Sequence, residues 1–259
     1  MILRPLEPDP PLKPGELMSA WKVVERLQRR TYQSCWMITQ PSHAALAGEI
    51  AAKLKGGAVP QLEPEVIRAI ALHDAGWGMP DAQAVMHSRA ASQTAPKSFL
   101  QVTVPEFLSA WTQSIEVALS TSPAGGYIVS RHFWRLAEHR LSSTADSQRD
   151  RSGLQKFVKF ESSRQARLVA KQDRTGQELE VLADVLQFCD LLSLYLCSGA
   201  TDNVEFAEYF GTRMRLTSSD QDIRLEPGVI ESGARFHVAA LRHPSTKQQS
   251  GQEIAFSFL

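Results

Sequence analysis

An aspartate lies in the most apolar stretch of the chain, where a charged side chain is unexpected. Asp190 is surrounded by the sequence LQFCDLLSLYL, and Leu186 and Leu194 lie about one helical turn to either side, on the same face of a predicted helix. Burying a carboxylate on such a face is costly unless it meets a cation, strong hydrogen-bond donors or a metal ion. Asp190 is therefore a candidate ligand, and a buried Asp–Arg pair or a helix-capping aspartate is the structural alternative.

Two histidines and a second aspartate lie in similar surroundings. His73 and Asp74 are adjacent near the end of a predicted helix and project about 100° apart. Both can still reach one point beyond the helix end, where Gly76 turns the chain. His43 begins another predicted helix and shares a face with Ile50. Each histidine alone is more often a hydrogen-bonded core or surface residue, but imidazole and carboxylate groups facing inward from three helices are a ligand set for zinc, iron or manganese.

The order of these residues, a His, a His-Asp pair and a distant helical Asp, resembles the signature of the HD-domain superfamily of metal-dependent phosphohydrolases. This resemblance implies an all-helical fold and a divalent metal ion bound by His43, His73, Asp74 and Asp190. Over roughly residues 15–200, four segments look like the blocks of an uncharacterised HD-like family labelled domain of unknown function 3891: ITQPSHAALAG at 38–48, HDAGW at 73–77, SRHF at 130–133 and QFCDLLSLY at 187–195. The label carries no substrate, so it supports the fold and the metal site more than a reaction.

His132 is a further candidate, because it lies about one helical turn from Ile128 and Leu136 on a predicted core-facing side. In binuclear members of the resembled superfamily, additional histidines between the His-Asp pair and the last Asp hold a second metal ion. His139 is two turns from His132, about 10 Å along the helix axis, so both cannot bind one ion directly. We therefore expect one ion, with a second as an option. His132 and Asp74 are the candidate catalytic residues: His132 would contact a phosphate or water, unless it is an ordinary buried histidine, and Asp74 would orient the water.

Charge is balanced over the whole chain but uneven along it. The 259 residues include 28 basic and 28 acidic side chains, a formal net charge of zero, which argues against binding of a nucleic-acid polymer. Between Arg131 and Arg174, however, eleven Lys and Arg stand against five Asp and Glu, a net charge of +6. This segment is either a solvated helix face or a positive rim that attracts a phosphorylated substrate. The candidate substrate-binding residues are then Arg131, beside His132, and Trp77, which could stack on a base but is otherwise a core aromatic.

The leading interpretation is a metal-dependent phosphohydrolase that acts on a small phosphorylated molecule or nucleotide with Fe, Mn, Zn or Mg. One alternative is a di-iron oxygenase of the HD fold, which would need more histidines than the chain clearly offers. The other is a non-catalytic metal-binding sensor or signalling module. The chain has three cysteines without zinc-site spacing, no signal-peptide pattern and no run of about 18 apolar residues. These features favour a cytoplasmic protein without a membrane segment, and a homodimer is compatible with them.

Helical periodicity predicts the elements that would carry these residues, and Gly and Pro mark their ends. Helices are expected at 16–30, 42–55, 64–75, 105–119, 127–141, 154–171 and 178–197. A long loop at 79–104 could cover a substrate, and a second loop is expected at 142–152. Residues 34–39 are expected to form a short strand or an extended entry to the helix that follows, for which Ser42 is the expected N-cap. After Gly211 the apolar period changes to two, which indicates four short strands.

The predicted fold is therefore mainly α. An HD-domain-like helical bundle is expected over residues 1–210, beginning with an extended Pro-rich lead-in at 1–15. A small antiparallel β annex at 211–259 would pack on this bundle. The bundle would supply the core and position the metal-ligand candidates, whereas the annex has no role that the sequence assigns.

Overall fold

The computed structural model describes residues 1–8, 10–90, 95–142, 146–219, 222–245 and 251–259. Its helices are α1 (Ala20–Gln28), α2 (Gln40–Ala52), α3 (Pro64–Ala71), α4 (Gly78–Ala90), α5 (Val104–Leu119), α6 (Pro123–Ser142), α7 (Gln148–Val169) and α8 (Gly176–Cys197), with short 3-10 turns η1 (Ala75–Trp77) and η2 (Phe99–Gln101). Hydroxyl side chains begin several of them. Thr39, Ser147 and Thr175 each accept a backbone N–H from the first turn of the helix that follows, as N-caps do.

The strands form one mixed sheet. They are β1 (Ile2–Pro5), β2 (Met18–Ser19), β3 (Cys35–Ile38), β4 (Val204–Tyr209), β5 (Thr212–Ser219), β6 (Asp222–Glu226), β7 (Arg235–His243) and β8 (Gly251–Phe258). The eight strands are ordered β1-β3-β7-β8-β6-β5-β4-β2. Most neighbours are antiparallel, but β2 pairs with β4 and β6 pairs with β8 in parallel.

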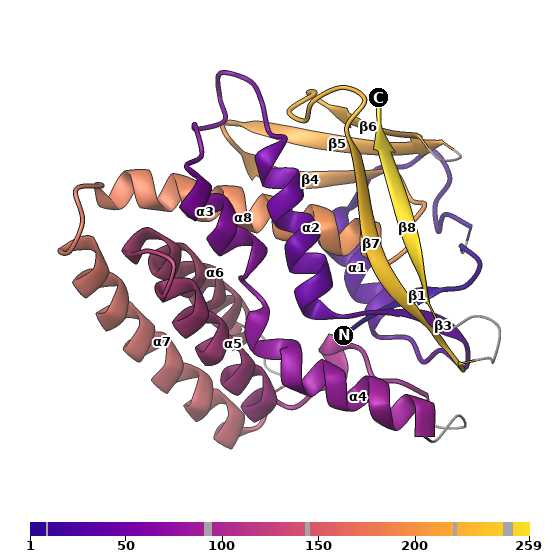
Figure 1. Ribbon diagram of the computed structural model, residues 1–259, viewed down its shortest axis with the longest axis horizontal. Coiled ribbons are helices and arrows are strands. Elements are labelled where there is room, and N and C mark those ends of the chain that lie inside the picture. Colours follow the sequence, from indigo (N-terminus) through magenta and orange to yellow (C-terminus); the bar gives the residue numbers. More distant parts are fainter. Residues whose placement is uncertain (9, 91–94, 143–145, 220–221, 246–250) are drawn as a thin grey trace.

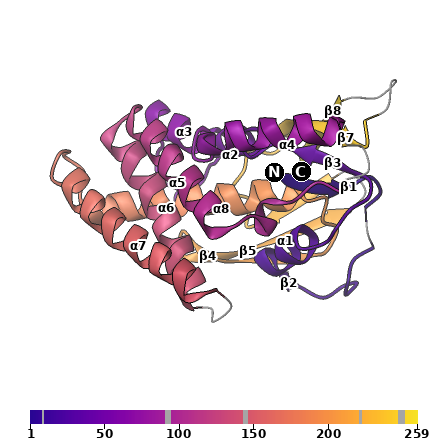
Figure 2. The same cartoon turned by 90° about the horizontal axis from the view of Figure 1, so that it is seen from below.

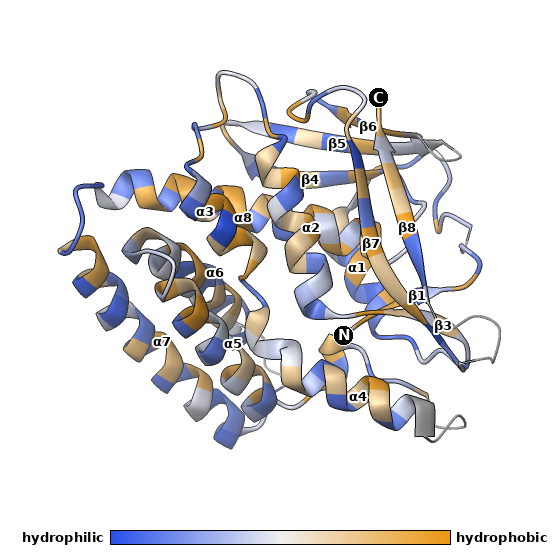
Figure 3. Ribbon diagram, in the orientation of Figure 1, coloured by the Kyte–Doolittle hydropathy of each residue, from blue (hydrophilic) through white to orange (hydrophobic). Residues whose placement is uncertain are grey.

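Helix α8 lies at the centre of the molecule. The helices α3, α5, α6 and α7 gather on one side of it, and most of the sheet lies on the other (Figure 1). Viewed from below, α2 and α3 lie on one side of α8, and α1 with β4 and β5 on the opposite side (Figure 2). The outermost helix, α7, alternates hydrophilic and hydrophobic residues, as a helix with one solvent-facing side does (Figure 3). Polar groups in the second half of α8, such as Asp190 and Ser193, are therefore buried.

The prediction of a mainly α fold with a small C-terminal annex is wrong, because both ends of the chain build the sheet. β1 pairs with β3 (Ile2↔Ile38), and β3 pairs with β7 (Cys35↔His243), so N-terminal strands extend the C-terminal ones. The fold is mixed α/β. The strands β1 and β3 have four residues and β2 has two, too few for a clear alternation in the sequence. The boundary predicted at residue 211 lies in the turn between the paired strands β4 and β5.

The long loop predicted at 79–104 is also wrong, because α4 occupies its first half. The buried side of α4 includes the polar residues Asp81 and Ser88, whereas Met79 and Met86 are exposed. This reverses the usual amphipathic pattern, so the helix has a weak signal in the sequence. The segment begins with a helix rather than with a loop that could cover a substrate.

The second predicted loop, at 142–152, is shorter than expected, because α7 already begins at Gln148. Residues 91–94 of the first loop and 143–145 of the second lie outside the described residues. The strand predicted at 34–39 is present as β3. The chain therefore reaches α2 directly from the sheet.

Small residues allow α3 to lie close to both of its helical neighbours. A β carbon on Gly48 of α2 would lie 2.5 Å from that of Ala71, and one on Gly125 of α6 would lie 2.8 Å from that of Ala69. Neither position has room for a larger side chain unless the helices separate. Because His43 is on α2 and His73 follows α3, the first of these contacts sets the spacing between two histidine-bearing segments.

We expect Gly48→Ala to lower the free energy of unfolding by about 1–3 kcal/mol, because the added methyl group forces α2 away from α3. The double variant Gly48→Ala/Ala71→Gly should recover part of this loss, measured as a coupling energy by urea denaturation. Gly57→Ala is the control, since a β carbon there meets nothing within 4 Å. Full stability of the Gly48→Ala single variant would contradict the close helix contact.

Candidate metal centre

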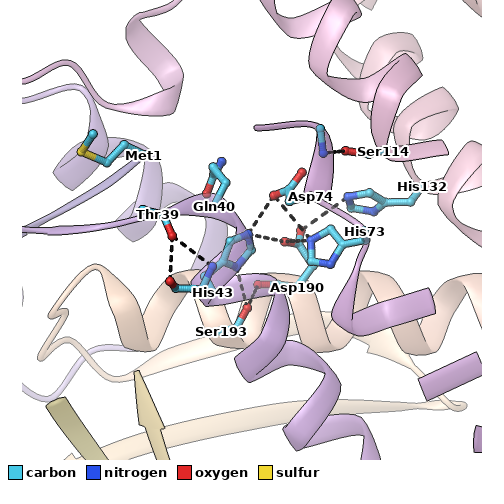
Figure 4. Close-up of polar contacts among 12 residues, drawn as sticks. Met1, Thr39, Gln40, His43, His73, Asp74, Ser114, His132, Asp190 and Ser193 are labelled. Carbon is cyan, nitrogen blue, oxygen red and sulfur yellow. Dashed lines mark hydrogen bonds and ion pairs between the residues drawn. The ribbon is translucent and has the colours of Figure 1, made fainter. Parts of the chain in front are cut away.

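The structure brings four polar side chains from separate elements to one buried point. His43 lies in the first turn of α2, His73 and Asp74 directly follow α3, and Asp190 lies in α8 (Figure 4). One ligand atom from each residue lies within 4.8 Å of those from the others. Ligands held about 2.0–2.2 Å from a shared ion are themselves about 3–4.4 Å apart. The cluster therefore has nearly the dimensions of a metal site.

The His-Asp pair is fixed by the way the chain leaves α3. The backbone N–H of His73 donates to Ile70 (3.2 Å), after which the chain turns into η1. Gly76, in that turn, lies against α5: a β carbon there would be 2.1 Å from the carbonyl oxygen of Ala110. The Gly76 N–H donates to the hydroxyl of Ser114 at 2.9 Å. A glycine is required here because α5 leaves no space for a side chain.

Both ring nitrogens of His43, near the start of α2, have polar partners within the protein. The helix begins at Gln40, because Thr39 rather than the predicted Ser42 is its N-cap. The hydroxyl of Ser193 donates to the carbonyl of Asp190 (2.9 Å) and so accepts the Nδ1–H of His43 (2.9 Å). With its proton on Nδ1, the neutral imidazole has a lone pair on Nε2, which lies 2.8 Å from Asp74 Oδ2.

His73 has the same arrangement through a different partner. Its Nδ1 lies 2.8 Å from the carbonyl oxygen of Ile70, which can only accept, so Nδ1 carries the proton. Its Nε2 lies 3.2 Å from Asp190 Oδ1 and 3.6 Å from Asp74 Oδ2. In both histidines, therefore, Nδ1 is already used and Nε2 faces carboxylate oxygens. Such pairs repel unless a proton or a metal ion lies between them.

The electrostatics of the cluster favour a cation. Burial lowers the pKa of His73, but Asp74 and Asp190 outweigh that effect and raise it to about 9. Burial raises the pKa of Asp190, yet the hydrogen bond from His73 and the nearby imidazoles bring it down to about 2. Without an ion, a proton on His73 therefore balances part of the charge of the two carboxylates. A divalent ion that displaced this proton would neutralise both carboxylates. The donor set, of two nitrogens and two oxygens, fits such an ion.

His132, on α6, lies beside the cluster but outside the set of four. Its Nε2 is 3.7 Å from Asp190 Oδ2, and its ring centroid is 5.6 Å from that of His73. Burial lowers the pKa of His132 to about 4, so the ring is neutral near pH 7. Its Nδ1 is buried and has no hydrogen-bond partner in the described part of the chain. The ring is thus available to a group that enters the site.

Arg131 and Trp77, the predicted substrate-binding residues, both have partners within the protein. The Arg131 guanidinium pairs with Glu180 at 2.9 Å and lies over the ring of Trp134, 4.3 Å from its centroid. Trp77 is only 2% exposed and meets Phe107 edge to face, with ring centroids 5.5 Å apart. Their proposed contact with a substrate stays a prediction.

Two residues of the site were missed by sequence reasoning. Ser193 lies one turn after Asp190, and Gln40 lies one turn before His43, so polar residues three positions from a candidate ligand were the available signal. The Gln40 side-chain oxygen is buried without a hydrogen-bond partner among the described residues. Figure 4 shows Gln40 next to His43. Unpartnered atoms of Gln40 and His132 therefore flank the cluster, as expected where a further ligand binds.

Comparison with known proteins gives one match. The family described as "Protein of unknown function (DUF3891)" matches residues 27–239 of the chain. No curated protein and no solved structure is significantly similar to it. Among the helices of the described residues, none combines the length and the apolar composition that crossing a membrane requires.

We expect Asp190→Asn to abolish metal binding, because it removes one of the two charges that balance the ion. Metal content of protein purified without chelator should fall to background, whereas the exposed histidine variant His237→Gln should retain it. Since an ion bound only to the folded state stabilises it, a chelator should lower the Tm of the wild type but leave that of Asp190→Asn unchanged. A Tm that does not respond to the chelator in the wild type would argue against a resident ion.

We expect Ser193→Ala to weaken metal affinity by about 10–100-fold, because the hydroxyl that fixes the His43 ring is lost. Competition with a chromophoric chelator measures this affinity. Ser163→Ala is the matched control, since that exposed hydroxyl donates to the carbonyl of Lys159 in its own helix and has no other hydrogen bond within the described part of the chain. Equal affinities in the two variants would show that the His43 ring is oriented without Ser193.

Proposed function

The chain belongs to the protein family of unknown function DUF3891, and from its site we propose that it is a metal-dependent hydrolase of small phosphoesters. The proposal rests first on one observation. Two imidazole Nε2 atoms and two carboxylates converge within 4.8 Å in a buried cluster, with each imidazole Nδ1 already used in a hydrogen bond. The order His, His-Asp, Asp is also that of the HD-superfamily phosphohydrolases, which the sequence resembles.

His43, His73, Asp74 and Asp190 would hold the ion. Mixed nitrogen and oxygen donors suit Fe, Mn or Zn, and Mg is the remaining candidate, although it prefers oxygen ligands. A divalent ion at this position would polarise a phosphoryl oxygen and lower the pKa of a water molecule. The four residues leave coordination positions open, as a catalytic site needs. One ion accounts for the two negative charges of the cluster.

Asp74 would orient the attacking water. Both of its contacts to imidazoles run through Oδ2, at 2.8 Å from His43 and 3.6 Å from His73. The second oxygen, Oδ1, is left to accept a hydrogen bond. The Asp74 side chain is 8% exposed and that of Asp190 is 11%, whereas both histidine side chains of the cluster are fully buried. Water and substrate therefore reach the cluster from its carboxylate side.

His132 would bind the phosphoryl group or pass a proton during the reaction. Its neutral ring has one nitrogen 3.7 Å from Asp190 and a second without a partner among the described residues. A neutral imidazole can donate from one nitrogen and accept at the other. Both catalytic assignments, Asp74 and His132, remain proposals, as does a small phosphorylated molecule or nucleotide as substrate.

The activity is tested by phosphate release from a panel of phosphomonoesters and nucleotides, with Mn²⁺, Fe²⁺, Zn²⁺ or Mg²⁺ added. We expect Asp74→Ala to abolish release. His132→Ala should lower kcat by about 100-fold or more while the metal content is unchanged, because a proton-transfer or binding group is lost but not a ligand. His43→Ala should remove both the bound metal and the activity. The surface control His237→Ala should retain both.

Three outcomes would contradict the hydrolase. Oxygen consumption without phosphate release would support the di-iron oxygenase instead. A metal-filled site that turns over neither kind of substrate would support the non-catalytic sensor. Phosphate release that survives Asp74→Ala would place the reaction elsewhere in the protein.

A further inference from the structure

A cavity of about 450 Å³ lies at the C-terminal end of α8, away from the metal cluster. Its walls come from the loop after α8, from β5, β6 and β8, and from Arg4 on the edge strand β1. Its lining is mixed, and Leu216, Ile223, Ile254 and Phe256 supply the apolar part. The volume is within the range of sites that hold small organic molecules. None of the four cluster residues lines it.

Arg4 provides a cation in this cavity without an anionic partner. Its guanidinium donates to the carbonyl oxygen of Leu196 at 2.7 Å and lies 5.9 Å from the centroid of the Phe256 ring. Among the described residues, no carboxylate forms an ion pair with it, and burial lowers its pKa. Arg4 is partly buried, and arginines withdrawn from water are normally paired with anions, so an anion would complete its interactions.

The contact with the C-terminal end of α8 uses only part of the hydrogen-bonding capacity of the Arg4 guanidinium. The carbonyl of Leu196 also accepts the backbone N–H of Gly199 at 3.2 Å, so the helix end is already partly satisfied. A guanidinium has several N–H donors, and one is used here. Gly199 has φ +69°, and a β carbon on it would lie 2.9 Å from Arg4 Cγ. The glycine therefore leaves the space in which Arg4 lies along the cavity wall.

An open strand edge supplies further polar groups. β8 pairs with β7 along its length but with β6 only at Ser257 and Phe258. The N–H of Phe258 donates on the β7 side and that of Leu259 on the β6 side, so odd-numbered residues direct their backbone groups away from β7. The backbone groups of Glu253 and Ala255, both cavity residues, therefore have no ladder partner among the described strands.

We propose that this cavity binds a small organic anion, with a carboxylate or phosphate group on Arg4 and an apolar body along β5, β6 and β8. The guanidinium matches either anion with paired N–H donors. The apolar walls would hold the body, and the free edge of β8 would accept or donate one hydrogen bond. This ligand site is separate from the metal cluster. Of the α8 residues that line the cavity, Tyr195 is the one closest in sequence to Asp190, and the two are about 8 Å apart along the helix axis. It does not depend on the hydrolase proposal.

Binding of hexanoate, hexyl phosphate, 1-hexanol and inorganic phosphate, measured by isothermal titration calorimetry, tests the site. We expect hexanoate or hexyl phosphate to bind at least about 10-fold more tightly than 1-hexanol or inorganic phosphate, because only they offer both an anion and an apolar body. The comparison of hexanoate with hexyl phosphate identifies which anion the site prefers. Equal binding of 1-hexanol, or equal binding of inorganic phosphate, would overturn the proposal.

Two variants locate the binding. Arg4→Gln should weaken binding of the preferred probe by about 10-fold or more, whereas Arg29→Gln, an exposed arginine paired with Glu25, should leave it unchanged. Ser218→Trp, which adds a large side chain on the face of β5 that it shares with the lining residue Leu216, should block binding while Arg4 stays in place. Wild-type affinity in either Arg4→Gln or Ser218→Trp would overturn the site, and melting curves show that each variant is folded.

Discussion

Asp74 and Asp190 place two carboxylates among buried side chains, and such groups persist only where hydrogen-bonding or ionic partners are held firmly against them. The partners here are the two imidazoles, 2.8 Å from Asp74 and 3.2 Å from Asp190. Each imidazole is in turn fixed through its Nδ1, by Ser193 or by the carbonyl of Ile70. The geometry therefore leaves one common point at which a proton or a divalent ion stabilises all four groups.

The scaffold meets this constraint through close helix packing. α3 approaches α2 and α6 where glycine and alanine face one another, and η1 approaches α5 at Gly76. Wider spacing would move His43 away from the His-Asp pair by more than the cluster can tolerate, since its ligand atoms span only 4.8 Å. The sheet contributes as well, because β3 leads through Thr39 directly into α2 and so fixes where the helix that carries His43 begins.

α8 connects two sites of opposite character. It carries Asp190, which belongs to the metal-ligand cluster, and Ser193, which contacts the cluster residue His43. Its C-terminal end lies at the cavity that contains Arg4, a cation with only a carbonyl as hydrogen-bond partner in the described structure. One site is thus suited to a metal ion and the other to an organic anion. The helix is buried along most of its length, so the two are held at a fixed separation.

The sequence by itself determined the helices that carry the site and the residues within them, because helical periodicity is local and a buried Asp190 or His43 interrupts an apolar face. It did not determine α4, whose buried side includes Asp81 and whose exposed side includes Met79. It also missed the mixed sheet: the strand β3 was predicted, but not its pairing with β7, some 200 residues away, or with β1, which is too short to show an alternating pattern. The sequence predicted that His43, His73, Asp74 and Asp190 share one site, but only the tertiary structure decided how closely they approach, that Ser193 orients His43, and that Arg4 lies without an anion among the described residues. Each of these is a contact between segments far apart in the chain, and no local pattern encodes such a distance.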